Sequence, residues 1–311
     1  MTLPAKLWIP ALAGALLGLT ACDIEDFSGF GRYSQDFHYS YPLKSGGQFS
    51  LETFNGSVEV TAWDQSTVDI SGAKTGPTQD AADALKVSID NSPDSVSVHV
   101  VRPTERRNNL GARFVIKVPR GSNVSRLITS NGSIRLDDAT GPARLKSSNG
   151  SIRVRGVHGS LDAQTSNAPI EISDINGDAV LHSSNGHIHA DHLVGSLDAT
   201  TSNSGISATV EKSGPAIHLG SSNGPIELTL PANFTNSVRA NTSNNSITLR
   251  LPGEPNAHIV ASTSNAGISS DFDVQVHGEI RRNHMDAVLG SGGPTLDLST
   301  SNGGIRLLRT R

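Results

Sequence analysis

Cysteine, aromatic side chains and charge are all scarce in this sequence. Its 311 residues include one cysteine, so no disulfide can form within the chain. Aromatic residues make up 4% and charged residues 17%, whereas glycine occurs 31 times. This composition is typical of turn-rich β structure and argues against a helical bundle. The net charge of −4 provides no basic field for nucleic acid, so no nucleic-acid partner is predicted.

The single cysteine, Cys22, follows an N-terminal segment with the features of a secretion signal. Met1–Lys6 is short and basic, and the apolar stretch Leu7–Leu19 is too short to cross a bilayer. The letters LTAC, which end at Cys22, resemble the cleavage site of a bacterial lipoprotein, where the cysteine thiol receives lipid. We therefore predict a signal peptide over 1–21, lipidation of Cys22 and a membrane partner reached through that lipid. An ordinary signal peptide with an incidental cysteine is the alternative.

The residues after Cys22 predict a polar tether over 22–36. Its first residue after the cysteine, Asp23, resembles a signal that retains lipoproteins at the inner membrane. The predicted location is thus the bacterial cell envelope, lipid-anchored and either periplasmic or at the cell surface.

A motif of Ser-Asn, usually followed by Gly, recurs along the chain, at first every eighteen residues. The repeated asparagines are Asn131, Asn149, Asn167, Asn185, Asn203, Asn223, Asn244, Asn265 and Asn302. An isoleucine follows each asparagine by three positions, and apolar and polar residues then alternate, which predicts a half-buried strand. A short exact period of this kind indicates a solenoid, whose units bury their apolar faces only by stacking.

Two architectures fit a strand, a turn and a second strand in each repeat. Asn-Gly between alternating segments favours a hairpin and hence an antiparallel meander. However, the second strand carries Ala143 and Leu145 in one repeat and Leu161 and Ala163 in the next, so large and small residues exchange places. That exchange keeps the packed volume constant only if residues eighteen apart touch. We therefore predict an all-β fold, a flattened parallel β-solenoid with two strands per coil of about 18 residues.

The asparagines are predicted to form a structural turn ladder. Asn tolerates a left-handed corner, and its side chain is expected to bond to the backbone of the next coil. Residues 126–311 form the predicted solenoid with an interrupted C-terminal coil, and residues 37–125 a β-rich N-terminal cap. Within the cap we expect strands near 68–70, 87–89, 96–101 and 113–118, and a short helix after Pro77.

These motifs resemble the bacterial putative-adhesin β-strand-repeat family, a domain of unknown function. The resemblance is carried by NGSVEVTAWD near the start, the SNGxI repeats and GSGGPTLDLSTSNGGIRL near the end, and it spans Phe37 to Leu308. It implies an envelope-associated solenoid with an adhesive or scaffolding use, and it supplies no catalytic residues.

No group of residues in the sequence predicts an active site. GSSNG at Gly220–Gly224 matches the nucleophile-elbow pattern, but no helix pattern follows it. His187 and His189 flank Ile188 and point to one outer face, as two weak metal ligands would, yet a polar ladder explains them equally. Asp137 and Asp138 form an acidic pair that is expected to lie in a turn. We therefore predict no catalytic residue, no resident metal and no cofactor.

The leading prediction is a non-catalytic envelope lipoprotein that presents a rigid solenoid surface for adhesion or scaffolding, with an envelope protein or glycan as partner. A periplasmic envelope-stress sensor or regulatory partner is the alternative. A carbohydrate-active β-helix enzyme is a third possibility, but the shortage of aromatic residues argues against it.

Overall fold

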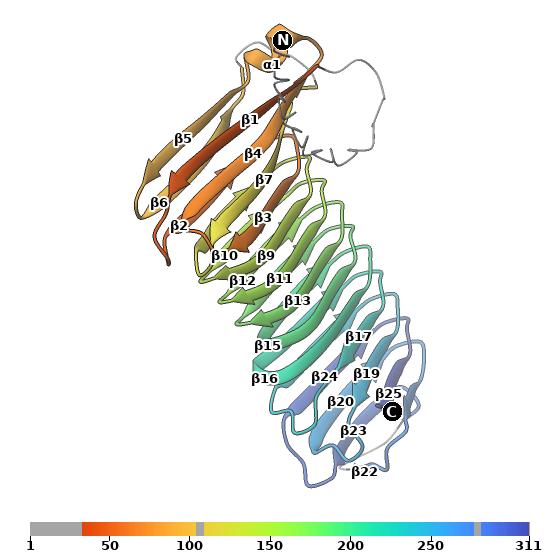
Figure 1. The fold of residues 1–311 in the computed structure, drawn as a ribbon. Helices are drawn as coiled ribbons and strands as arrows, with labels where there is room; N and C mark the ends of the chain where they lie inside the picture. Colours follow the sequence, from red (N-terminus) through yellow and green to blue (C-terminus); the bar gives the residue numbers. More distant parts are fainter. Residues whose placement is uncertain (1–32, 104–108, 277–280, 311) are drawn as a thin grey trace, which may run out of the picture. The chain divides into compact units, whose positions relative to one another are not determined.

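A computed structural model describes residues 33–103, 109–276 and 281–310, except for the side chains of Ser213 and Val276. Residues Arg32–Arg311 form one compact unit. In this unit the strands succeed one another as a stack of coils (Figure 1). Neighbouring coils pair in parallel through two sets of strands, here named ladder A and ladder B. The predicted β-solenoid is confirmed.

Ladder A contains the strands that lead into the Ser-Asn corners, together with strands that extend the same sheet at both ends of the stack. In spatial order it comprises β5 (Lys86–Ser92), β6 (Ser95–Val101), β2 (Gln48–Glu52), β8 (Asn123–Ile128), β10 (Ala143–Lys146), β12 (Leu161–Thr165), β14 (Ala179–Ser183), the second halves of β15 (Ile188–Thr201) and β16 (Ile206–Ser221), β18 (Ser237–Thr242), β24 (Thr295–Thr300), β20 (Ala257–Thr263), β23 (His284–Leu289) and β22 (Gln275–Val276).

Ladder B contains the strands that leave those corners. In spatial order it comprises β1 (Tyr33–Pro42), β4 (Thr67–Gly76), β7 (Gly111–Pro119), β3 (Val58–Trp63), β9 (Ile134–Thr140), β11 (Ile152–His158), β13 (Ile170–Asn176), the first halves of β15 and β16, β17 (Ile226–Thr229), β19 (Ile247–Leu251), β25 (Ile305–Arg309) and β21 (Ile268–Ser270). The predicted short helix is α1 (Gln79–Asp83), which Thr78 caps at its N-terminus.

The register confirms the large-for-small exchange that favoured a solenoid over a meander. Ala143 pairs with Leu161, and Leu145 pairs with Ala163, in parallel and with no strand between them. All four side chains are buried. The isoleucines behave likewise in ladder B, where Ile152 lies between equivalent isoleucines of the coils on either side. The apolar residues of the two ladders thus meet in one continuous core.

The spatial order of the coils differs from their order in sequence at both ends of the stack. The coil of β2 and β3 lies between that of β6 and β7 and that of β8 and β9. At the other end, the coil of β24 and β25 lies between that of β18 and β19 and that of β20 and β21. The predicted division at residues 125 and 126 falls inside β8, so the cap and the repeats share their ladders without a break.

Where glycine follows a repeated asparagine, the neighbouring coil leaves no room for a side chain. A Cβ on Gly150 would overlap the carbonyl oxygen of Gly132, and one on Gly186 would overlap that of Ala168. By contrast, none of the nine repeated asparagines has a positive φ, so the prediction of a left-handed asparagine is wrong. The corner is tight because another backbone lies directly against it.

Residues other than glycine follow the asparagine only where both neighbouring coils have glycine, or at the end of the stack. Ala168 lies between Gly150 and Gly186, and Ser204 lies between Gly186 and Gly224. No two adjacent coils carry a side chain at this place, which is the sequence signature of the close backbone approach.

A column of buried hydroxyl groups lies inside the same corner, two residues before each asparagine. Ser147 Oγ donates to the carbonyl oxygen of Gly132 at 2.9 Å and accepts from the backbone N–H of Gly150 at 2.9 Å. Each hydroxyl therefore ties a corner to the preceding coil. The column comprises Thr129, Ser147, Thr165, Ser183, Thr201, Ser221, Thr242, Thr263 and Thr300. In the sequence, this column corresponds to the Ser or Thr that precedes each Ser-Asn pair, a pattern whose role was not predicted.

Replacing a corner glycine should destabilise the stack. Gly150→Ala forces a side chain against the backbone of Gly132, and we expect it to lower the free energy of unfolding by about 1–3 kcal/mol. Gly253→Ala is the matched control, because a Cβ there meets no atom within 4 Å. Urea unfolding followed by circular dichroism measures both. Equal stability of the two variants would contradict the proposed contact between coils.

Candidate binding surface

The outer face of ladder B carries a column of polar side chains, one from each coil. Arg135, Arg153, Glu171, His189 and Ser207 follow one another at equivalent positions of β9, β11, β13, β15 and β16. Their strands alternate buried and exposed residues, so this column faces solvent while the isoleucine before each member faces the core. Arg153, Glu171 and His189 thus lie side by side on three successive coils, as a polar ladder requires.

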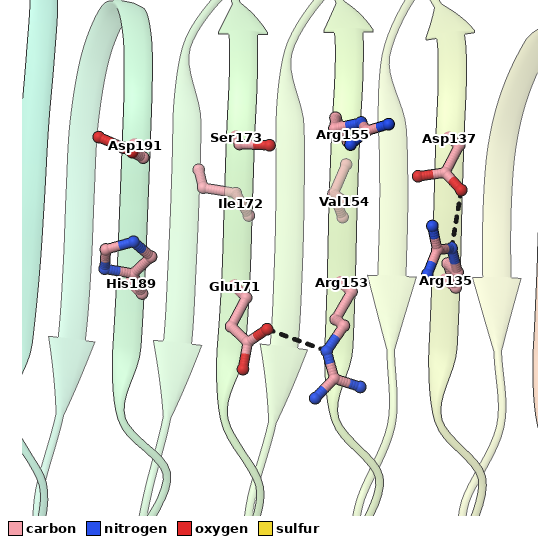
Figure 2. A pocket seen from close by; sticks show the side chains of 10 residues that line it. All are labelled: Arg135, Asp137, Arg153, Val154, Arg155, Glu171, Ile172, Ser173, His189 and Asp191. Carbon is pink, nitrogen blue, oxygen red and sulfur yellow. Dashed lines mark hydrogen bonds and ion pairs between the residues drawn. The ribbon is translucent and has the colours of Figure 1, made fainter.

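Charges in this column are paired either within a strand or between coils. Arg153 Nε lies 2.9 Å from Glu171 Oε2 on the next coil, whereas Arg135 Nε lies 2.7 Å from Asp137 Oδ2 on its own strand (Figure 2). The hydrogen bond to Asp137 raises the pKa of the Arg135 guanidinium above its usual value. Two arginines stacked on adjacent coils are therefore each neutralised by a different carboxylate.

These residues surround a shallow groove of about 260 Å³, which extends from β9 to β15. Arg155, from the middle of the groove, makes no ion pair or side-chain hydrogen bond within the described part of the chain, and its side chain is exposed. Its neighbours across the ladder are Asp137, already bonded to Arg135, and Ser173. The groove therefore offers one uncommitted guanidinium among charges that are otherwise paired (Figure 2).

Two histidines converge on a serine at the far side of this column. His189 Nδ1 lies 2.8 Å and His187 Nε2 lies 3.1 Å from Ser207 Oγ. Partial burial between coils, and then the nearby His189, lower the pKa of His187 below its usual value. A third histidine, His192, lies near carboxylates of three residues instead: Asp174, Asp191 and Glu211.

This cluster is not a complete metal site. Among the described residues, no three His, Cys, Asp or Glu side chains are grouped as a metal ion would require. His187 and His189 are two imidazole groups that both contact the hydroxyl group of Ser207. The prediction of no resident metal stays a prediction.

The other candidate catalytic residues take structural positions. The GSSNG segment forms an Asn corner, and the strand β17 follows it instead of the helix that a nucleophile elbow needs. Asp137 and Asp138 lie inside β9, so their placement in a turn was wrong. Asp138 has a φ of 59°, and Asp174 and His192 have the same left-handed backbone conformation at the equivalent position of later coils. The strands of ladder B therefore share a backbone irregularity at this position.

The repeated asparagines form a second exposed column, at the corner between the ladders. Each side-chain N–H group donates to the amide oxygen of the previous asparagine, for example Asn149 Nδ2 to Asn131 Oδ1 at 2.6 Å. The bonds run in one direction from Asn55 to Asn265. The prediction that these side chains bond to backbone was wrong, because amide lies against amide at the exposed corner.

The predicted lipidation site, Cys22, lies outside the described residues, and so does the signal peptide. Within 33–103, 109–276 and 281–310, no helix is long and apolar enough to cross a membrane.

Comparison with known proteins identifies the family. The model of the Toastrack DUF4097 family matches residues 48–308, from β2 to β25. The chain belongs to this family. The resemblance seen in the sequence motifs is confirmed, since Toastrack DUF4097 is a domain of unknown function with this repeat architecture. No curated protein matches the chain.

Two solved structures are similar to this Toastrack chain, each with 11% sequence identity. One is a putative cell adhesion protein from Clostridium sporogenes, where 89% of this chain and 100% of that chain are covered with a TM-score of 0.25. The other is a putative adhesin from Bacteroides fragilis, where the coverage is 88% and 97% and the TM-score is 0.31.

The lowered pKa of His187 predicts a pH-dependent contribution to stability. The folded chain favours the neutral imidazole, so stability present above about pH 6.5 is lost as the pH falls toward the folded-state pKa. His187→Asn should therefore make the free energy of unfolding less dependent on pH below 6.5. The effect is small, because the side chain is largely exposed. His158→Asn, at an exposed position of β11, is the control, and an identical pH profile for His187→Asn and the parent would refute the assignment.

Proposed function

We propose that this Toastrack protein is a non-catalytic lipoprotein of the bacterial cell envelope, whose solenoid serves adhesion or scaffolding. The observation that supports this best is the outer face of ladder B. It presents an ordered column of paired charges around an open groove, and the described residues contain no group of His, Cys, Asp or Glu side chains that could hold a metal ion.

Rigidity suits such a surface to binding. From the coil of β2 and β3 to that of β20 and β21, each coil is fixed to the next by two parallel strand pairs, an asparagine amide and a hydroxyl group, as between the coils of β9 and β11. Side chains on such a frame lose little further freedom when a partner binds, which favours affinity without any conformational change.

The groove favours a partner that carries carboxylate groups. Arg155 presents the planar fork of donors that a carboxylate accepts in two hydrogen bonds, and its charge is not neutralised by a neighbour. An acidic envelope glycan and an acidic segment of an envelope protein both offer that group.

A periplasmic sensor or regulatory partner is the second candidate function. It is favoured by Asp23, directly after the proposed lipidated cysteine, because this residue resembles an inner-membrane retention signal. Protease treatment of intact cells separates the two functions: digestion supports a surface adhesin, whereas protection together with inner-membrane fractionation supports the sensor.

Removing the proposed anchor should release the protein. We expect Cys22→Ala to move the chain from the membrane fraction to the soluble envelope fraction, because several acyl chains at about 0.8 kcal/mol per buried CH₂ are lost. Immunoblots of fractionated cells measure this. Ser28→Ala, in the predicted tether, is the control and should stay with the membrane. A Cys22→Ala variant that stays there too would refute the anchor.

The groove can be tested by reversing its free charge. Arg155→Glu should reduce capture of acidic glycans or envelope proteins on a pull-down at least about tenfold, since a carboxylate then faces a carboxylate. Arg306→Glu is the matched control, because Arg306 is exposed on the same ladder several coils away. Equal loss in both variants would indicate non-specific charge attraction and contradict a site at Arg155.

A further inference from the structure

Strand β1 is a long free edge at the N-terminal end of ladder B. Its ten residues pair antiparallel with β4, and no other strand of the described chain pairs with β1 (Figure 1). The edge facing away from β4 therefore has backbone N–H and C=O groups without strand partners. Such an edge is a template for one more strand.

The sequence of β1 is partly symmetric about its centre. From residue 33 it reads YSQDFHYSY, with Phe37 at the centre. Tyr33 mirrors Tyr41, and Ser34 mirrors Ser40. Around Phe37 the mirror pairs are an acid with a histidine, Asp36 with His38, and an amide with a phenol, Gln35 with Tyr39.

A mirrored sequence has a direct consequence for antiparallel pairing. When two copies of β1 pair about a two-fold axis midway between their Phe37 residues, each of residues 33–41 lies opposite its mirror residue in the second copy. Tyrosine then meets tyrosine, serine meets serine, and Asp36 meets His38. Aromatic pairs and hydroxyl pairs stabilise antiparallel sheets, and a histidine N–H group opposite an aspartate can donate a hydrogen bond to it.

Asp36 and His38 both lie on the exposed face of β1. His38 Nε2 is held 2.6 Å from Asp69 Oδ2 of β4, so in the pair it would lie between that carboxylate and Asp36 of the second copy.

The opposite face of β1 has a polar group that needs a partner. Gln35 Oε1 is buried and has no hydrogen-bond partner in the described chain. Tyr39, on the same face, is 37% exposed, which is unusual for a large side chain of this protein. Two-fold pairing places Gln35 opposite Tyr39 of the second copy and covers the exposed Tyr39 ring.

We propose that the chain forms a homodimer by antiparallel pairing of β1 with β1 of a second copy, about a two-fold axis midway between the two Phe37 residues. The pairing joins the two ladder B sheets edge to edge. The other free edge at this end, β5, reads KVSIDNS, which has no such mirror pattern. A pair of nine residues, 33–41, offers a number of hydrogen bonds similar to that of a typical protein interface, which is about 10.

Cysteine cross-linking tests the register. The chain from residue 23 onward keeps the whole compact unit and has no cysteine of its own. Ser34 and Ser40 are exposed, so Ser34→Cys and Ser40→Cys should not disturb folding. The proposed register puts residue 34 of one copy opposite residue 40 of the other, within reach of a disulfide, while each residue is far from its own equivalent.

We expect a disulfide-linked dimer when the two variants are mixed and mildly oxidised, and no comparable dimer from either variant alone. A mixture that stays monomeric refutes the proposal. Equal cross-linking of the single variants and the mixture also refutes it, because that pattern reports random collision or another register.

Charge reversal tests the same interface without a new thiol. In sedimentation velocity, Asp36→Lys should raise the dimer dissociation constant at least about tenfold, because lysine then faces His38 of the second copy. Asp90→Lys on the free edge β5 makes the same charge change at an exposed position and should leave the constant unchanged. A parent chain that is monomeric at all concentrations, or a dimer that Asp36→Lys does not weaken, overturns the proposal.

Discussion

Direct contact between equivalent residues of successive coils is the constraint on which this structure depends. Parallel strands lie only about 4.8 Å apart, so each position of a coil has the same position of the next coil as its nearest neighbour. Inside the core, this contact requires Ala143 opposite Leu161 and Leu145 opposite Ala163. At the Asn corner, where backbone meets backbone, it leaves no room for a Cβ on Gly150. The same contact between coils explains both the exchange of large and small residues and the regular spacing of the corner glycines along the chain.

The same contact governs where charges are placed. A charged residue repeated at one position would face its own kind in the next coil, which is unfavourable. The Asn corners avoid the problem with uncharged amides, which bond in a chain from Asn55 to Asn265. The outer face of ladder B resolves it by pairing, since the stacked Arg135 and Arg153 each bond a different carboxylate. Arg155 is the exception in the groove, and this exception is why the surface is a candidate for binding.

Sequence reasoning predicted contacts between adjacent repeats well, because the period states which residues meet. It did not predict which coils are neighbours at the two ends of the stack, where the spatial order of the coils differs from their order in the sequence. Every coil carries the same corner, so nothing in the motif indicates that Val238 pairs with Leu296 of the last coil, or that the coil of β2 and β3 is inserted between later ones. The groove was missed for a related reason. Arg155 lies beside Asp137 and Ser173 only once the exact register is known, and a lone arginine in the sequence carries no such signal.

The inserted coils make the two ends of the stack depend on distant segments. Asn149 bonds a residue 18 positions away, whereas Asn302 bonds one 58 positions away, which raises the loop-closure cost by about 1 kcal/mol. In return, the coil of β24 and β25, which is last in the sequence, has strand partners on both sides, because β24 pairs with β18 and with β20.

The ends also differ in how they protect their edges. At the C-terminal end the final strands are short, two residues in β22 and three in β21. At the N-terminal end β1 exposes an edge of ten residues. Proteins commonly blunt their free edges by shortening or charging the last strand, because an open edge recruits other strands. The C-terminal end follows this rule and β1 does not, since its charges are one acid and one histidine that become complementary when β1 meets itself. An edge left long and made self-complementary is the pattern expected of a strand that is paired in the assembled protein.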